Sequence, residues 1–187
     1  MIGVLKSVVS VTIVLSFFAQ TVKAQVENSF PTITPTPKVA IEYSLPYPGI
    51  LPNHPLYFLK QARDRILLWL TTEREKKSNV YLLLADKHLV MGGMLYEKGL
   101  YDLSVNTLKT GEKYLLDSVL ILTDGENADG LSPGLTDKLE LAVKKHEEQI
   151  TTLKEKEEQE KSRVELNEVL GITHQAIQKL TILRTKT

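Results

Sequence analysis

The distribution of proline constrains this chain more than any other feature. Seven of its eight prolines lie between residues 31 and 55, and the eighth is Pro133. Because proline fixes φ and removes a backbone donor, the proline-rich part favours extended structure and turns. The remaining sequence is free to form long helices. We therefore expect an all-α fold, an antiparallel bundle of about five helices within residues 45–185.

The N-terminal residues 1–24 have the pattern of a secretory signal peptide. An apolar run covers residues 8–19, and Val22 and Ala24 place small residues at the −3 and −1 positions of a cleavage site. A membrane-spanning helix needs about 20 apolar residues. We therefore expect export with cleavage after Ala24, and an uncleaved membrane anchor is the alternative. Residues 25–44 are rich in Pro and Thr and are predicted to be an extended linker.

A proline-rich apolar stretch leads into the helical part. Residues 47–57 read Tyr-Pro-Gly-Ile-Leu-Pro-Asn-His-Pro-Leu-Tyr. A glycine after a proline, as at Gly49, is typical of a type II turn whose third position needs positive φ. Pro55 suits the first turn of a helix, with Asn53 or His54 as the cap.

The same stretch is too apolar for a solvated linker. We expect Tyr47, Ile50 and Leu51 to pack on the helical core, which would hold the bundle at a fixed angle to the linker. The alternative is an exposed polyproline-type ligand for the aromatic groove of a partner.

These residues resemble the hallmark of a bacterial family of exported proteins, the domain of unknown function 5667, which is Tyr-Pro-Gly-x-Leu-Pro-Asp-x-Pro-x-Tyr. The matching residues are Tyr47, Pro48, Gly49, Leu51, Pro52, Pro55 and Tyr57. Asn53 replaces the aspartate of the motif, and beyond the motif the resemblance continues weakly through residues 84–89 and fades after about Val119. It implies an exported helical domain. It assigns no activity, so no catalytic, cofactor-binding or metal-binding residue follows from it.

Apolar residues recur at helical spacing along the rest of the chain. In the first helix the predicted inward face comprises Leu56, Leu59, Ile66 and Leu70, widened by Phe58, Leu67 and Trp69. A second helix is predicted from Thr72, where Thr72-x-x-Glu75 forms a capping box, to Gly99. A third runs from about Leu100 to Thr123.

Two glycines inside these helices call for a packing explanation, because each costs about 1 kcal/mol relative to Ala. A hairpin that reverses near residue 100 sets Gly92 opposite Leu108 and Gly111 opposite Leu89. We therefore expect each glycine to receive a leucine from the partner helix.

Residues 133–184 are predicted to form two helices. A single helix would be about 77 Å long at 1.5 Å per residue, far longer than its neighbours. The apolar stripes that end at Leu153 and begin at Leu166 are about 220° out of phase. Ser162-x-x-Glu165 offers a capping box that places a turn or kink near residues 157–162.

Three patterns suggest chemistry, and each has a structural explanation. Residues 130–134 fit the G-x-S-x-G pattern of serine hydrolases, but proline follows the serine, so the backbone N–H of the oxyanion hole is missing. The serine and proline instead favour a helix N-cap and first position. Residues 124–130 form an acidic loop without EF-hand ligand spacing. His88 and His146 lie on apolar stripes and could meet in the bundle, although the sequence has no Glu-x-x-His metal pair.

Composition and charge exclude several function classes. The chain has no cysteine, hence no disulfide framework and no thiolate metal site. Without Lys6 and Lys23, which precede the predicted cleavage point, 21 of the 23 basic residues remain against 23 acidic ones, with no basic cluster for nucleic acid. We expect no catalysis, no cofactor and no nucleic-acid partner. The predicted role is an exported interaction or structural module of the cell envelope with a protein partner, touching the membrane only through its signal peptide. The alternative is a small-ligand or metal-binding bundle.

Overall fold

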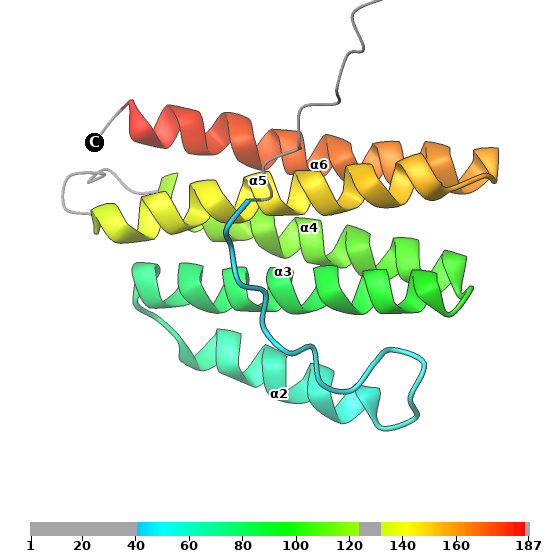
Figure 1. Cartoon of the computed structure of the whole chain (residues 1–187). Coiled ribbons are helices and arrows are strands. Elements are labelled where there is room, and N and C mark those ends of the chain that lie inside the picture. Colours follow the sequence, from blue (N-terminus) through cyan, green and yellow to red (C-terminus); the bar gives the residue numbers. More distant parts are fainter. Residues whose placement is uncertain (1–40, 124–131, 186–187) are drawn as a thin grey trace, which may run out of the picture. The chain divides into compact units, whose positions relative to one another are not determined.

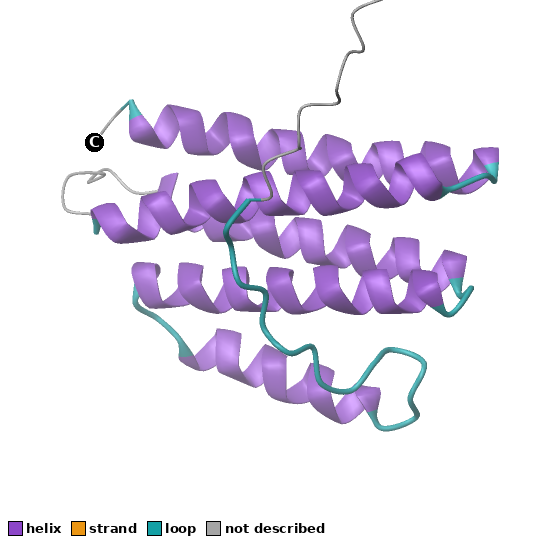
Figure 2. Ribbon diagram, in the orientation of Figure 1, coloured by secondary structure: helices purple, strands orange, loops and turns teal. Residues whose placement is uncertain are grey.

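The computed structural model describes residues 41–123 and 132–185 of the chain. Within these ranges the chain forms helices and no strand (Figure 2). The five helices are α2 (Tyr57–Leu70), α3 (Arg74–Glu97), α4 (Tyr101–Thr123), α5 (Pro133–Lys156) and α6 (Glu160–Arg184). The prediction of an all-α helical bundle is confirmed.

Helices α3 to α6 form the bundle, and α2 lies outside it along α3 (Figure 1). α3 and α4 form a hairpin, α4 packs against α6, and α5 packs against α6 and α3. Among the described helices, α2 packs against α3 alone. Residues 41–56, called the leading segment below, run across α3 before the chain turns into α2 (Figure 1).

The interior of the bundle contains two apolar clusters, each built from all four helices α3 to α6. The first comprises Leu82, Ala85, Leu115, Val119, Leu122, Leu135, Leu139, Ala142, Val143, Ala176, Leu180 and Leu183. The second comprises Leu89, Val105, Leu108, Ile150, Leu166, Val169 and Leu170. Full burial of a leucine or valine side chain contributes roughly 1.5–3 kcal/mol, so these clusters hold the bundle together. They lie on the stripes that helical periodicity predicts for the last four helices.

Glycines fix the spacing of the α3–α4 hairpin. A Cβ built on Gly92 would lie 2.5 Å from Leu108 Cγ, which confirms the predicted pairing. A Cβ on Gly111 would lie 2.8 Å from His88 Cβ and 3.5 Å from the backbone nitrogen of Leu89. Gly111 thus approaches α3 beside Leu89 as predicted, but the atoms nearest to the new Cβ belong to the His88 side chain and the α3 backbone.

The predicted end of α3 is confirmed, whereas its predicted start is wrong. Gly99 has φ +72°, and the Leu100 N–H donates to the Leu95 carbonyl at 3.0 Å, which closes the C-terminus. At the other end the helix begins at Arg74 without a side-chain cap. The carboxylate of Glu75, predicted to complete a capping box with Thr72, instead accepts the Ser132 N–H at 2.7 Å.

The break between α5 and α6 confirms the prediction of two helices. Residues 157–159 separate them, and the Gln159 N–H donates to the Glu157 carboxylate at 2.9 Å. A buried glutamate therefore closes this turn, which has neither glycine nor proline. The predicted capping box at Ser162 is wrong, because Ser162 is already inside α6 and is buried. At the start of α5, Ser132 and Pro133 occupy the predicted N-cap and first position.

Several predictions fall on residues beyond those described. The signal peptide, almost all of the linker and the acidic loop at residues 124–130 belong to this group. Within the described ranges, no helix has the length and apolar character to cross a bilayer.

Candidate functional site

Helix α2 is amphipathic, and its apolar side faces away from the bundle. At about 100° per residue, six side chains share an arc of about 120° on the side opposite Lys60 and Asp64. This outer face comprises Phe58, Leu59, Ala62, Ile66, Trp69 and Leu70. All six are exposed, and Trp69 keeps 78% of its surface accessible. Arg63 and Arg65 lie at the two edges of the arc, and both are exposed.

The prediction that the apolar stripe of this helix faces inward is therefore wrong. Every side chain assigned to it is exposed: Leu56, Phe58, Leu59, Ile66, Leu67, Trp69 and Leu70. The buried residues of α2 are Lys60, at 8% exposure, and Asp64, at 6%. A helix with this pattern can turn its polar side inward only when those polar groups find partners there.

Lys60 and Asp64 find partners on α3 and within α2 itself. Lys60 Nζ donates to Met91 Sδ at 3.4 Å and lies 5.3 Å from the centre of the Tyr57 ring. The Asp64 carboxylate accepts from Arg63 Nε at 3.0 Å and Nη2 at 2.7 Å. Burial lowers the pKa of Lys60 below its ordinary value, and Asp64 opposes that shift. The Lys60–Met91 contact crosses to α3, whereas the Tyr57 ring and the Arg63–Asp64 ion pair lie within α2 and partner its buried charges there.

His88 of α3 completes this contact as a neutral side chain. Its Nδ1 lies 2.7 Å from the Leu84 carbonyl, so that nitrogen carries the proton. Its Nε2 lies 3.2 Å from the Tyr57 hydroxyl and accepts from it. The ring also meets Tyr114 edge-on at 5.3 Å between centroids. Burial lowers the pKa of His88, which favours this uncharged tautomer.

The leading segment packs on the bundle through residues upstream of those predicted. The Tyr43 hydroxyl donates to Asp86 Oδ2 at 2.8 Å. Tyr43 and Leu45 each pack against one apolar cluster, and Pro48 is buried. Proline restricts the unfolded segment and so reduces the entropy lost when it packs.

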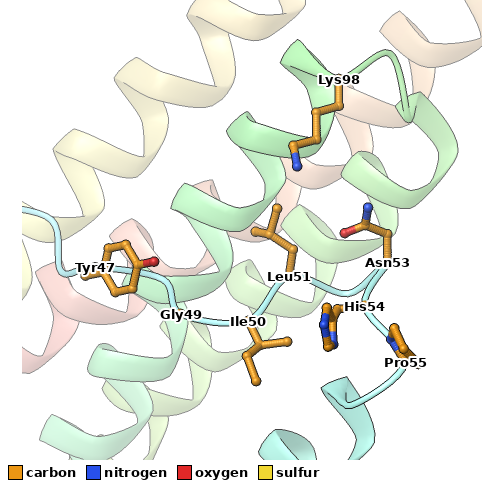
Figure 3. Close-up of a pocket in the computed structure, with 8 residues that line it drawn as sticks. All are labelled: Tyr47, Gly49, Ile50, Leu51, Asn53, His54, Pro55 and Lys98. Atoms are coloured by element: carbon orange, nitrogen blue, oxygen red, sulfur yellow. The ribbon is translucent and has the colours of Figure 1, made fainter.

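The motif residues are divided between the bundle and solvent. Tyr47 is 83% exposed and Ile50 is also exposed, so the prediction that they pack on the core is wrong. Leu51 and Pro52 are half-buried, and Figure 3 shows Leu51 pointing toward α3 and Lys98 while Ile50 points the other way. Gly49 has φ +77°, as the predicted turn requires.

The start of α2 differs by two residues from the prediction. Pro55 is exposed and lies in the turn before α2, which begins at Tyr57. The N-cap is Leu56 without a side-chain cap, so the prediction of Asn53 or His54 as the cap is wrong, although His54 Nδ1 accepts the Leu56 N–H at 3.1 Å. Asn53 is exposed. Tyr57 is half-buried and contacts His88, so its hydroxyl ties the end of the motif to α3.

Two open pockets flank the leading segment. One, of about 520 Å³, includes Leu51, His54 and Lys98 (Figure 3). The other, of about 450 Å³, lies along the Arg63 edge of α2 and is called the flank pocket below. It is lined by Tyr47, Pro48, Gly49, Ile50, Leu56, Leu59, Lys60, Arg63 and Lys87. An apolar wall and three cationic side chains therefore meet beside the outer face.

A second polar cluster lies in the centre of the bundle, where it joins helices α3, α4, α5 and α6. His146 of α5 is fully buried, with Nδ1 2.7 Å from Glu112 Oε1 of α4 and Nε2 3.1 Å from Asp86 Oδ1 of α3. The Thr173 hydroxyl of α6 donates to Glu112 Oε2 at 2.7 Å, and Tyr43 donates to Asp86. We call these five residues the central network.

His146 is charged in this network. Both ring nitrogens face carboxylate oxygens, so both must carry protons to donate. Burial opposes the charge, but the charges and hydrogen bonds of Glu112 and Asp86 outweigh it and raise the pKa of His146 to about 9. In each of the four helices the network residue lies, along the sequence, between members of the two apolar clusters.

The two histidines that were considered for a ligand site have separate partners. His88 binds Leu84 and Tyr57, and His146 binds Glu112 and Asp86. In the part of the chain that the structure describes, no group of three or more His, Asp or Glu side chains is arranged to hold a metal ion. The central network has the residue types of acid–base chemistry, yet it is buried and its groups bind each other.

Comparison with known proteins places the chain in a family context. A family model described as Domain of unknown function (DUF5667) matches residues 49–176. No curated protein and no solved structure matches. The matched range begins inside the motif at Gly49, covers α2 to α5 and ends within α6.

Proposed function

The chain belongs to the family described as domain of unknown function 5667, and we propose that it is an exported, non-catalytic helical module that attaches to a surface of the cell envelope through the outer face of α2. The observation that carries this proposal is the orientation of α2. Its apolar side is exposed and its ionic side is buried.

Energetics favour a binding role for this orientation. Scattered exposed apolar residues are ordinary, but a contiguous exposed apolar face commonly marks an interaction site. Each aliphatic or aromatic side chain of that face would gain roughly 1.5–3 kcal/mol on full burial. The exposed Tyr47 and Ile50 of the leading segment extend the apolar surface beside α2. Most of the large apolar side chains exposed on the described surface therefore lie on α2 and the leading segment, where burial by a partner would be favourable.

The rest of the described domain supports the face mechanically. Tyr43 links the leading segment to Asp86, and Tyr57 links the start of α2 to His88. The central network crosses the bundle and fixes the register of its four helices through hydrogen bonds. In this proposal the buried ionisable groups have a structural role, which leaves the module without catalysis.

The proposal is tested by replacing apolar residues of the outer face with serine and measuring where the protein fractionates in its host cell. The double variant Ile66→Ser/Leu70→Ser should shift the exported protein from the envelope fraction to the medium or soluble fraction. Because both side chains are exposed, the melting temperature should change little. The matched control is Val164→Ser/Ile182→Ser on α6, where both residues are about half exposed. This control should keep its envelope association.

Two results would overturn this assignment. One is full envelope association of the α2 double variant. The other is an equal loss in the α6 control, because that would mean that exposed apolar residues act without regard to location.

A further inference from the structure

The edges of the outer face carry cations, and the face itself carries aromatic and aliphatic side chains. Trp69, Phe58 and Ile66 lie between Arg63 on one edge and Arg65 on the other. Asp64 is the single acidic residue of the helix sequence, and it is buried and bound to Arg63. The solvent side of α2 is thus apolar in the middle with an arginine at each edge, of which Arg63 is paired with Asp64 and Arg65 is exposed.

A helix that lies flat in a bilayer surface has this distribution. Its apolar side enters the acyl region by about 5–10 Å, while Arg and Lys at its edges reach the phosphates of the headgroups. Aromatic side chains such as Trp are favoured at this depth. With 14 residues, α2 is about 21 Å long, which suits a helix lying in the plane of the surface.

The flank pocket lies beside the outer face of α2. It opens along the Arg63 edge, between α2, α3 and the leading segment. Lys60, Arg63 and Lys87 bring three cations to it, and Tyr47 and Ile50 form an apolar wall. Burial is the main cause that lowers the pKa of Lys60; Lys87 and Arg63 act in the same direction, and Asp64 opposes them. A phosphate group placed there would be attracted by all three.

Charge distinguishes this partner from a second copy of the chain. A twofold dimer through the outer face would bring the same patch against itself. Arg63 and Arg65 would then line both sides of the seam, without an acidic residue of α2 free to oppose them. An anionic lipid surface instead supplies the opposite charge along both edges.

We propose that the outer face of α2 docks into an anionic phospholipid bilayer and that the flank pocket receives a lipid phosphate. The inference rests on the proposed function and names the envelope surface. By this inference the folded domain itself binds the membrane, in addition to the transient contact expected of the signal peptide.

Trp69 provides a specific reporter, because it is the one tryptophan of the chain. The purified chain, as its host processes it, is mixed with vesicles of phosphatidylcholine alone or of phosphatidylcholine and phosphatidylglycerol in equal parts. Trp69 emission should shift to the blue with the anionic vesicles and be quenched by brominated acyl chains. Because the signal comes from α2, an attached N-terminal segment would not produce it.

Variants separate the apolar and ionic contributions. Ile66→Ser/Leu70→Ser should weaken vesicle partitioning at least tenfold. Arg65→Gln/Lys87→Gln should weaken it roughly fivefold for each charge removed, with a smaller loss at high salt. The charge control Lys179→Gln, exposed on α6, should partition as the unchanged protein does. Circular dichroism confirms that each variant is folded.

The outcomes also separate this inference from the proposed function. Unchanged Trp69 emission with anionic vesicles, together with envelope association that still depends on Ile66 and Leu70, would overturn the lipid inference in favour of a protein partner. A concentration-dependent blue shift without vesicles, with a dimer in sedimentation, would overturn it in favour of a second copy. If Ile66→Ser/Leu70→Ser behaved like the unchanged protein in both the envelope fractionation and the vesicle assay, both proposals would be overturned.

Discussion

The charge on His146 predicts how stability depends on alkaline pH. The folded protein holds the pKa of this side chain at about 9, against an ordinary value of 6.5. Each unit of pKa corresponds to 1.36 kcal/mol, so the protonated network contributes on the order of 3 kcal/mol. Because the folded pKa is raised, this contribution is fully present below pH 6.5. It is lost as pH rises through 9.

Chemical unfolding at a series of pH values measures this loss. The free energy of unfolding should fall by about 3 kcal/mol between pH 6 and pH 10. In His146→Gln, whose side chain does not titrate, the decline in this range should be much smaller. NMR of the histidine rings provides a second measurement that needs no variant. It should show His146 protonated at pH 8 and His88, whose pKa is lowered by burial, neutral.

The two hydrogen bonds of His146 require both ring nitrogens to be protonated. Deprotonation of His146 would leave one ring nitrogen lone pair facing a carboxylate oxygen of Asp86 or Glu112 inside the bundle. A His146 ring that titrates near its ordinary pKa, or an unfolding free energy that is flat from pH 6 to pH 10, would refute the assignment of a protonated network.

Further predictions concern the hairpin glycines, Tyr43 and the N-terminus. Gly92→Leu should cost roughly 1–3 kcal/mol of stability by chemical unfolding, because the new side chain would meet Leu108. Gly93→Ala should gain up to about 1 kcal/mol, because nothing lies within 4 Å of the new Cβ. Equal effects of the two substitutions would contradict the α3–α4 register. Tyr43→Phe should cost roughly 1–3 kcal/mol by leaving Asp86 with one partner fewer, and the exposed Tyr47→Phe should be neutral. Mass spectrometry of the exported protein should find its N-terminus directly after Ala24, whereas an intact Met1 in the membrane fraction would indicate an anchor.

The bundle could be predicted from sequence because apolar spacing carries most of its information. In α3 to α6 the stripes with helical period are the buried faces, and Gly99 ends α3 where a left-handed residue was expected. The pairing of Gly92 with Leu108 also followed from simple hairpin arithmetic. These features depend on local pattern and on one reversal of the chain. They require no knowledge of distant partners.

The partners within the central network could not be predicted from sequence, although the polar residues at inward helix positions could be recognised. Glu112 occupies the gap in the apolar stripe of α4 between Leu108 and Leu115. His146 lies on a predicted apolar stripe, and Thr173 follows Leu170 at helical spacing in the stripe that begins at Leu166. A polar residue at an inward position predicts a buried partner. It does not identify that partner, because Glu112 meets side chains 34 and 61 residues away.

Helix α2 shows a different limit. A periodic stripe establishes that a helix has an apolar side, but the side that faces the bundle depends on what the neighbouring helix offers. Here α3 presents Met91 and His88, which bind Lys60 and Tyr57. The capping box predicted at Thr72 failed for a similar reason, since Glu75 binds Ser132 across the structure. A distant polar partner determined the outcome for Glu75 and for the inner face of α2, whereas the box at Ser162 failed because α6 already begins at Glu160.

The orientation of α2 also has an energetic consequence. Facing the bundle with its apolar side, α2 would gain the burial of its leucines and of Trp69, and Lys60 and Asp64 would stay hydrated at little cost. The observed orientation forgoes that gain and places a lysine and an aspartate at a buried contact. Such an arrangement is favoured in the complete system when a second apolar phase covers the outer face. Under the proposed function, the polar contact with α3 keeps α2 aligned, and docking would release the free energy of burying the exposed side chains.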